Sequence, residues 1–490
     1  MDILERLRYW SHIHPDQPAH CSDGRLLTYR EFEDHSDALA AHLSSFAPDN
    51  HAPLAVVGHK EPEMLVAFLA AVKSGHPYIP IDVSTPAQRI EKIIEISHAF
   101  VCLTPQKVEE QLADLKGQES AFTPRIIAPQ DPWYIIYTSG STGEPKGVVI
   151  TTACLESFVK WMVKEQCPRE QKEVFLNQAP FSFDLSVMDL YMSLATGATL
   201  YSITKDEIGE PSQLFISLAR SNVTIWVSTP SFAQMCLTEP TFSEQMLPGL
   251  HKFLFCGETL PPDVAAKLIH RFPAAEVWNT YGPTEATCAT TSVQITSSLL
   301  ARYSPLPVGR PKPDCQIIIA NEDGLPSAQN TRGEIIIAGP NVSPGYLNEP
   351  ALTERTFFIH AGQRAYRTGD LGHFDHGLLF FDGRRDNQVK LHGYRIELGD
   401  IESNLLALPS VLDAVVIPFL KDGRPNFLVA FVILKDPPSA VDFEFTRQFK
   451  RTLGAHIPAY MLPRKFVFMD KFPMTVNGKA DRRKLAESLS

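Results

Sequence analysis

The stretch Tyr137–Gly147 reads YTSGSTGEPKG and combines the chemical groups that a phosphate site requires. Its glycines let backbone N–H groups point inward, its hydroxyls add donors, and Lys146 adds a positive charge. The stretch does not match the G-x-x-x-x-G-K-[ST] phosphate loop, because Pro145 precedes the lysine and a glycine follows it. Taken alone, it fits either a phosphate site or an ordinary flexible loop.

Four other stretches place polar and charged groups at close spacing further along the chain. They are NTYGPTEAT (279–287), YRTGDLG (366–372), GRRDNQVKLHGYRIELGDIE (383–402) and NGK, which ends at Lys479. Together with 137–147, and in this order, they resemble the motifs of the adenylate-forming superfamily. That superfamily contains acyl-CoA synthetases, luciferases and the adenylation domains of nonribosomal peptide synthesis. The resemblance covers nearly the whole chain and implies that a carboxylate attacks the α-phosphate of ATP, which gives an acyl-adenylate and pyrophosphate.

The resemblance implies a role in ATP binding for residues of all five motifs. Glu285 matches the magnesium ligand, and a lone carboxylate suits Mg²⁺, which keeps most of its water ligands. Asn279 and Tyr281 resemble the adenine contacts, while Asp370 and Arg384 match the residues that bind the ribose. Matches to the loop that holds the β- and γ-phosphates are Thr138, Ser139, Gly140, Thr142 and Lys146, and further residues of the nucleotide site are Gly257, Glu258, Thr280, Gly282 and Thr284, the last as a donor to an α-phosphate oxygen. The alternatives are a surface acid for Glu285 and a core aromatic for Tyr281.

Lys479 matches the catalytic lysine of the superfamily, which bridges the substrate carboxylate and the α-phosphate as negative charge develops. Arg395 aligns with an arginine that lies near the phosphates. Superfamily members rotate a small C-terminal domain between their two reactions, and Asp386 stands at the hinge position. Lys390 would face the site in the second pose. On the composition of the basic tail alone, Lys479 would read as one more solvated lysine.

Three stretches more closely resemble the members that activate D-alanine for a carrier protein: 75–90, 181–200 and 253–261. Asp184 matches the acid that receives the α-ammonium group, and a buried ammonium needs a partner charge. Leu185 and Met188 match the positions that line the side-chain pocket of those members, and their bulk would leave room for a small side chain. Cys256 is hypothesised to fill space on one face of the substrate carbon and so to favour D- over L-alanine. The alternatives are a loop or cap aspartate at Asp184 and a buried small hydrophobe at Cys256.

This resemblance implies an enzyme with two reactions. It would form D-alanyl-AMP with ATP and Mg²⁺, then transfer D-alanine to the phosphopantetheine thiol of a separate D-alanyl carrier protein, for D-alanylation of lipoteichoic acid. One alternative is a stand-alone adenylation enzyme for glycine or L-alanine. A second is an acyl-CoA synthetase or luciferase-like oxidase, which Asp184 disfavours, and a third is an inactive ATP-sensing protein.

The elements that must position these residues follow a strand–helix alternation in the first half of the chain. Residues 53–60 predict a buried strand, the following residues a helix, and 84–96 a helix with Thr85 as N-cap and Pro86 as first residue. Such alternation predicts a parallel sheet covered by helices. From residue 301 short strands with many prolines and glycines predict a β-rich, barrel-like subdomain. We therefore expect an α/β fold with a large domain at 1–385 and a small, mobile α+β domain at 386–490. The large domain would contain two βα-layered subdomains and a small β-barrel-like part at about 301–385.

Bulk properties exclude several classes. The chain has 490 residues and a formal net charge of -11, which disfavours nucleic-acid binding through its overall field. Its eight cysteines form no C-x-x-C pair, so we expect reduced thiols in the cytoplasm and no zinc site. It has neither an apolar secretory leader nor an apolar run of roughly 18 residues, so no membrane insertion is expected. A monomer is expected.

Overall fold

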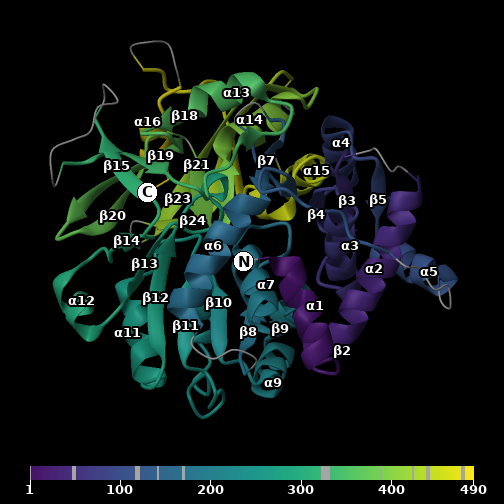
Figure 1. Ribbon diagram of the computed structural model, residues 1–490. Coiled ribbons are helices and arrows are strands. Elements are labelled where there is room, and N and C mark those ends of the chain that lie inside the picture. Colours follow the sequence, from purple (N-terminus) through teal and green to yellow (C-terminus); the bar gives the residue numbers. More distant parts are fainter. Residues whose placement is uncertain are drawn as a thin grey trace. The chain divides into compact units, whose positions relative to one another are not determined.

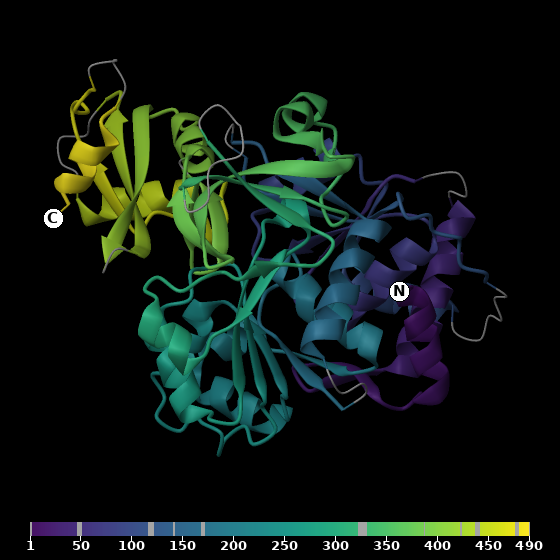
Figure 2. The ribbon, with the colours of Figure 1, turned by 60° about the vertical axis from the view of Figure 1, so that its left-hand side comes forward.

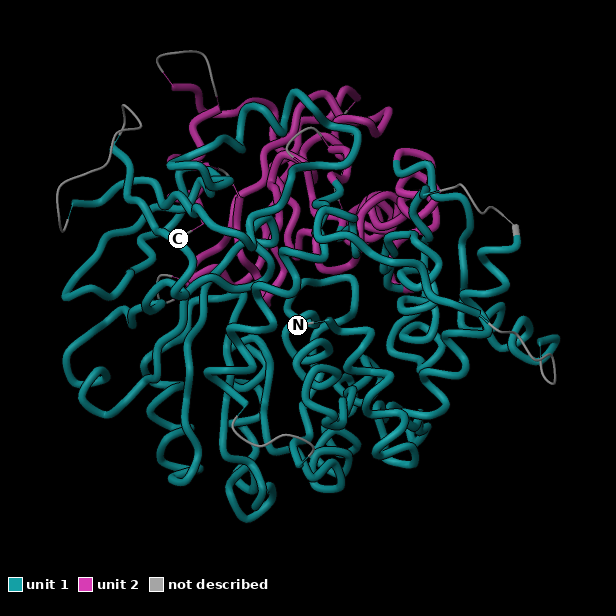
Figure 3. The backbone as a smooth tube through the Cα atoms, in the orientation of Figure 1, with its two compact units in different colours: residues 1–82, 97–136, 147–385 teal, residues 83–96, 137–146, 386–490 magenta. Residues whose placement is uncertain are grey.

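A computed structural model divides the chain into two compact units (Figure 3). Unit 1 comprises residues 1–82, 97–136 and 147–385, and unit 2 comprises residues 83–96, 137–146 and 386–490. The structure describes residues 2–46, 51–115, 122–140, 143–167, 172–321, 331–386, 388–421, 424–436, 442–475 and 480–489.

A six-stranded sheet forms one core of unit 1. Its order is β17-β7-β6-β4-β3-β5, and the pairs β3–β4, β3–β5 and β4–β6 are parallel, as the strand–helix alternation predicts. Helix α3 is buried at every position, which explains why its sequence is apolar on all sides. The strands are β3 (Leu54–Gly58), β4 (Tyr78–Asp82), β5 (Val101–Leu103), β6 (Pro132–Thr138), β7 (Lys146–Thr151) and β17 (Gly345–Tyr346), with helices α2 (Tyr29–Phe46), α3 (Pro62–Lys73) and α5 (Pro105–Leu115).

A nine-stranded sheet forms the second core of unit 1, with helices on both of its faces (Figure 2). Its order is β14-β13-β12-β11-β10-β8-β9-β1-β2, and its central pairs from β12 to β9 are parallel. The strands are β1 (Pro18–Ser22), β2 (Arg25–Thr28), β8 (Val174–Asn177), β9 (Thr199–Ser202), β10 (Ile225–Ser228), β11 (Lys252–Phe255), β12 (Glu276–Tyr281), β13 (Thr291–Gln294) and β14 (Arg310–Pro311). The helices are α1 (Ile3–Ile13), α6 (Thr152–Gln166), α7 (Leu185–Thr196), α8 (Lys205–Gly209), α9 (Pro211–Ser221), α10 (Pro230–Cys236), α11 (Pro262–Arg271) and α12 (Ser297–Arg302).

Helix α7 is buried along its whole length, and residues from the start of the chain hold its C-terminal end. Helix α1 packs beside it (Figure 1). The Arg6 guanidinium donates to the carbonyl oxygen of Ala195 at 2.7 Å, and the Tyr29 hydroxyl donates to that of Ala198 at 2.8 Å. The last carbonyls of a helix have no partner within the helix, and the Arg6 side chain satisfies that of Ala195, whereas Tyr29 holds Ala198, just beyond the helix end.

The third sheet of unit 1 is antiparallel and comes from the segment where the sequence predicts a β-rich part. Its order is β15-β16-β19-β18, with β20 paired to β19. The elements are β15 (Gln316–Ala320), β16 (Gly333–Ala338), β18 (Phe357–His360), β19 (Gln363–Asp375), β20 (Leu378–Arg384) and helix α13 (Pro350–Thr356).

Unit 2 contains a β-hairpin, a three-stranded sheet and helices. In the sheet, β23 and β24 pair as far as Lys421 and Arg424. Helix α4 begins at Ala87, so the predicted start at Pro86 is wrong by one residue. The elements are α4 (Ala87–Ser97), β21 (Gln388–Leu391), β22 (Tyr394–Glu397), α14 (Leu398–Leu406), β23 (Val411–Lys421), β24 (Arg424–Leu434), α15 (Phe443–Leu453), β25 (Lys465–Phe468) and α16 (Arg482–Glu487).

The predicted α/β class is confirmed by these mixed sheets and helices. Among the described residues, no helix has the length and apolar character needed to cross a bilayer. All eight cysteines are described, and all are free thiols.

Candidate active site

The end of strand β12 offers an unsatisfied acceptor for a nucleotide base. The side-chain amide of Asn279 donates to the carbonyl oxygen of Pro307 at 2.8 Å, whereas its own Oδ1 is buried and has no protein partner. Buried polar atoms without partners are rare in folded proteins. The amino group of adenine is a donor of the kind that Oδ1 lacks, so this residue fits the predicted adenine contact.

Two residues after Asn279, the same strand contributes to a carboxylate site. The Tyr281 hydroxyl donates to Asp370 Oδ2 at 2.6 Å, and the Arg384 guanidinium pairs with Asp370 Oδ1. Burial, and then the charge of Asp370, raise the pKa of Tyr281 well above its ordinary value, so its hydroxyl remains a donor. The two oxygens of one fixed carboxylate suit the two neighbouring hydroxyls of a ribose.

The turn after β12 holds the predicted magnesium ligand. Gly282 is required there, because a Cβ would lie 2.7 Å from the Ala289 Cα and would meet the neighbouring backbone. Glu285, on the 3₁₀ turn Thr284–Ala286, is fully buried, and its Oε1 accepts from the Tyr346 hydroxyl at 2.8 Å. Among the described residues no cluster of three or more His, Cys, Asp or Glu side chains forms a metal site. A single carboxylate fits Mg²⁺, which takes its other ligands from water and phosphate.

Three more predicted nucleotide residues lie close to this strand. The Thr280 hydroxyl donates to the carbonyl oxygen of Phe255 at 2.8 Å and so ties β12 to β11. Gly257 has a φ of 88°, a left-handed conformation that glycine adopts without strain. The Glu258 carboxylate accepts from the backbone N–H of Ser231 at 3.0 Å.

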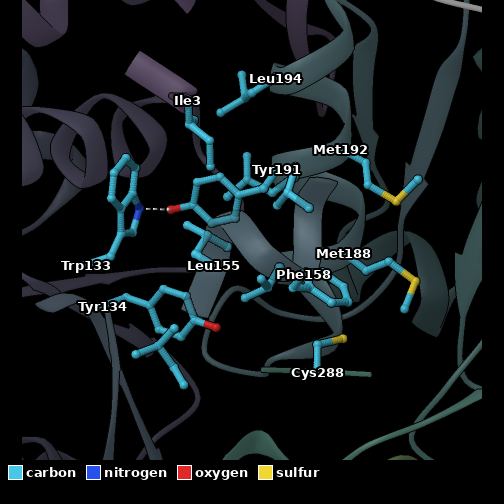
Figure 4. Packing of buried hydrophobic residues seen from close by; sticks show 14 of the residues in the cluster. Ile3, Trp133, Tyr134, Leu155, Phe158, Met188, Tyr191, Met192, Leu194 and Cys288 are labelled. Atoms are coloured by element: carbon cyan, nitrogen blue, oxygen red, sulfur yellow. Dashed lines mark hydrogen bonds between the residues drawn. The ribbon is translucent and has the colours of Figure 1, made fainter. Parts of the chain in front are cut away.

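Three of the four predicted substrate residues lie at the start of α7, and the fourth, Cys256, follows β11. Asp184 occupies the N-cap position, but its side chain makes no cap hydrogen bond, which argues against the capping alternative. Leu185 and Met188 are buried. The Cys256 thiol, also buried, lies 3.6 Å from the carbonyl oxygen of Cys288, and Figure 4 shows Met188 and Cys288 bordering one region of the core.

A buried lysine that sequence reasoning missed holds the loop leading to Asp184. Lys60 donates to the carbonyl oxygens of Asn177 and Gln178, at 2.8 Å each. The side chain of Asn177 in turn donates to Asp189 Oδ1 at 3.1 Å. Burial lowers the pKa of Lys60 to about 7. These hydrogen bonds hold the loop between β8 and α7 in place, and so they also hold the Asp184 carboxylate at the start of α7.

Unit 2 contains the predicted phosphate loop and the hairpin β21–β22. Thr138 Oγ1 is buried without a protein partner, as expected of a donor reserved for a ligand. The Ser139 hydroxyl donates to the Arg395 carbonyl oxygen at 3.1 Å and accepts from the Glu397 N–H at 3.0 Å. Lys390 stands opposite Arg395 in the hairpin. The loop and the hairpin thus lie together in this unit.

The remaining predicted residues are placed as follows. The described part of the phosphate loop includes Gly140, which is buried, and Lys146, which is half-buried. Asp386 is exposed, and its carboxylate accepts from the Gln388 N–H at 3.2 Å. Thr142 and Lys479 lie outside the described residues.

Two family models match successive parts of the chain. The model for the AMP-binding enzyme matches residues 7–347, and the model for the AMP-binding enzyme C-terminal domain matches residues 400–479. This chain belongs to the AMP-binding enzyme family. The predicted resemblance to adenylate-forming enzymes is therefore confirmed.

Relatives and solved structures extend this assignment. Proteins named D-alanine--D-alanyl carrier protein ligase from Bacillus mycoides (strain KBAB4) and Bacillus thuringiensis (strain Al Hakam) are 48% and 47% identical to this AMP-binding enzyme, over 100% of both chains in each case. The adenylation domain AlmE of Vibrio cholerae, solved with glycyl-adenosine-5'-phosphate, has a TM-score of 0.83 at 23% identity, and the match covers 99% of this chain and 96% of that one. That structure supports the fold.

Proposed function

We propose that this AMP-binding enzyme uses ATP to activate D-alanine and then transfers it to the phosphopantetheine thiol of a D-alanyl carrier protein. The observation that carries the proposal is the non-capping Asp184 carboxylate at the start of α7, followed in that helix by the buried Leu185 and Met188. An acid next to apolar side chains suits a small amino acid. The full-length relatives named as ligases for D-alanine support the same substrate.

In the first reaction a carboxylate oxygen of D-alanine attacks the α-phosphorus of ATP. A new P–O bond forms, the bond to the β-phosphate oxygen breaks, and pyrophosphate leaves. Asn279 would orient the base, Asp370 and Arg384 the ribose, and Thr138 a phosphate oxygen. Glu285 would hold Mg²⁺, which would neutralise charge on the phosphates when bound. Lys479 and Thr284 would stabilise charge at the reacting carboxylate and the α-phosphate.

In the second reaction the carrier thiol attacks the carbonyl carbon of D-alanyl-AMP, and AMP leaves with the electron pair. We place the hinge for the change between reactions at Asp386, the boundary between domains 1–385 and 386–490, and assign Lys390 and Arg395 to the hairpin that serves the second pose. The proposal includes a monomeric cytoplasmic enzyme whose product supports D-alanylation of lipoteichoic acid.

ATP–pyrophosphate exchange with D-alanine, L-alanine, glycine and D-serine tests the proposal. D-Alanine is expected to give the highest kcat/KM, and Lys479→Ala is expected to remove exchange because it removes the transition-state cation. A higher kcat/KM for glycine or L-alanine would replace the substrate assignment. Absence of exchange with every amino acid would overturn the proposed chemistry.

A further inference from the structure

Tyr134, in the middle of β6, carries a buried hydroxyl that bonds to nothing in the protein. The neighbouring aromatic groups are paired. The Tyr78 and Tyr191 hydroxyls lie 2.6 Å apart, and the Trp133 indole N–H donates to Tyr191 at 2.8 Å. The unpaired hydroxyl is thus specific to Tyr134 within this cluster of rings.

The Tyr134 hydroxyl points toward the side of the core that holds Met188, one of the predicted substrate residues. Figure 4 shows it directed away from the Trp133–Tyr191 pair and toward the side of the core where Met188 and Cys288 lie. Burial raises the pKa of Tyr134 well above its ordinary value, and the next contribution is the negative charge of Asp184. The hydroxyl is therefore neutral, and it lies within the field of the carboxylate assigned to the α-ammonium.

An unpaired buried hydroxyl destabilises the unliganded protein, because its hydrogen bonds to water are lost and none replaces them. A ligand that brings a donor removes this penalty. An amino-acid ammonium carries three N–H donors. A single carboxylate oxygen cannot accept all three of them. A neutral phenolic oxygen within reach of the same ammonium would supply a further acceptor.

We infer that Tyr134 Oη accepts an N–H from the α-ammonium of the substrate, opposite Asp184, and that it is a specificity-determining residue for amino acids. The inference rests on the proposed function, since it concerns the substrate of that same pocket. It explains why β6 carries a tyrosine here where phenylalanine would fill the same volume without an unpaired group.

Tyr134→Phe tests the inference through two independent measurements. The KM for D-alanine in pyrophosphate exchange is expected to rise about 10- to 100-fold, the usual effect of losing a hydrogen bond to a charged group, while the KM for ATP stays the same. The unfolding temperature without ligand is expected to stay the same or to rise, because the variant removes an unpaired buried hydroxyl.

Tyr78→Phe is the matched control, since it removes a paired hydroxyl from the adjacent strand. It should lower the unfolding temperature and leave the KM for D-alanine unchanged. A Tyr134→Phe enzyme with wild-type KM for D-alanine would overturn the inference, as would one with a lowered unfolding temperature and equal increases in both KM values. Wild-type exchange with D-alanine shows separately that the proposed function holds.

Discussion

Cys256 is buried beside Cys288 in the proposed substrate pocket, and its thiol is the candidate for contact with one face of the substrate carbon. In Cys256→Ala this contact is lost, so the ratio of kcat/KM for D-alanine over L-alanine should fall about 10-fold or more, as for one contact of methyl size. Adenylation kinetics with both alanines measure this ratio.

Cys236→Ala provides the control for that measurement. Cys236 is equally buried but belongs to α10 and to a different hydrophobic cluster of unit 1. Its removal should reduce stability and leave the ratio between the two alanines as it is. If Cys256→Ala behaves in the same way, Cys256 is only a packing residue.

The buried side chain of His20 makes the folding stability depend on pH. It is fully buried with Nε2 2.9 Å from the Ser202 hydroxyl, and burial lowers its pKa from 6.5 to about 3. Between these values the unfolded chain binds more protons than the folded one, so the stability due to neutral His20 is present above pH 6.5 and is lost toward pH 3.

Urea unfolding of the wild type and His20→Gln between pH 4 and 7 checks this effect. The dependence of the unfolding free energy on pH should be smaller in His20→Gln by about 1.4 kcal/mol per pH unit at most. Equal slopes in the two chains would contradict it.

At the scale of elements, a buried ion pair joins α4 to α14 within unit 2. Arg89 lies 2.9 Å from Asp400, whose Oδ1 also accepts from Asn404 at 2.9 Å. Arg89→Ala would leave a buried carboxylate without its cation, which typically destabilises a protein by about 3–5 kcal/mol. The urea midpoint should fall accordingly.

The double variant Arg89→Met/Asp400→Leu separates the charge effect from packing. Apolar residues of similar volume often replace a buried ion pair without loss of stability. The urea midpoint of the double variant should therefore return most of the way to the wild-type value. A single Arg89→Ala variant as stable as the wild type would show that the pair contributes nothing.

How far the sequence predicts these elements depends on the distance between partners along the chain. Residues 53–60 predict β3, and the isoleucine-rich segments predict β15 and β16, because the signal is local. The start of α4 was missed by one residue, since residue types at a helix start do not fix its exact boundary. No local sequence pattern predicts that Arg89 pairs with Asp400.

The same rule separates the site residues that were predicted from those that were missed. Asn279 to Glu285 form one motif, so a short stretch identifies them together. Tyr346 contacts Glu285 from 61 positions away, and Lys60 contacts Asn177 from 117 positions away. Tyr134 resembles any aromatic residue in a buried strand until its unpaired hydroxyl is seen.

At the scale of the molecule, Asp386 begins the last segment of unit 2. Proline fixes φ near −65°, so Asp386→Pro should block a backbone rotation at this position. We expect pyrophosphate exchange to persist and the rate of transfer to the carrier protein to fall, because only the second reaction requires the change of pose. Both half-reactions measured on one preparation give the answer. If both reactions lose the same activity, or if neither loses any, the assignment of the hinge to Asp386 is wrong.

The attachment of the first helix to α7 has a consequence for biosynthesis. The bond from Arg6 to Ala195 spans 189 positions, so α1 leaves the ribosome long before the surface it covers has been made. At translation rates of roughly 5–20 residues per second, that interval is on the order of 10–40 s. Throughout it, the apolar side chains of α1, Ile3, Leu7 and Trp10 among them, lack the neighbours that α7 supplies, which leaves apolar surface exposed while synthesis continues.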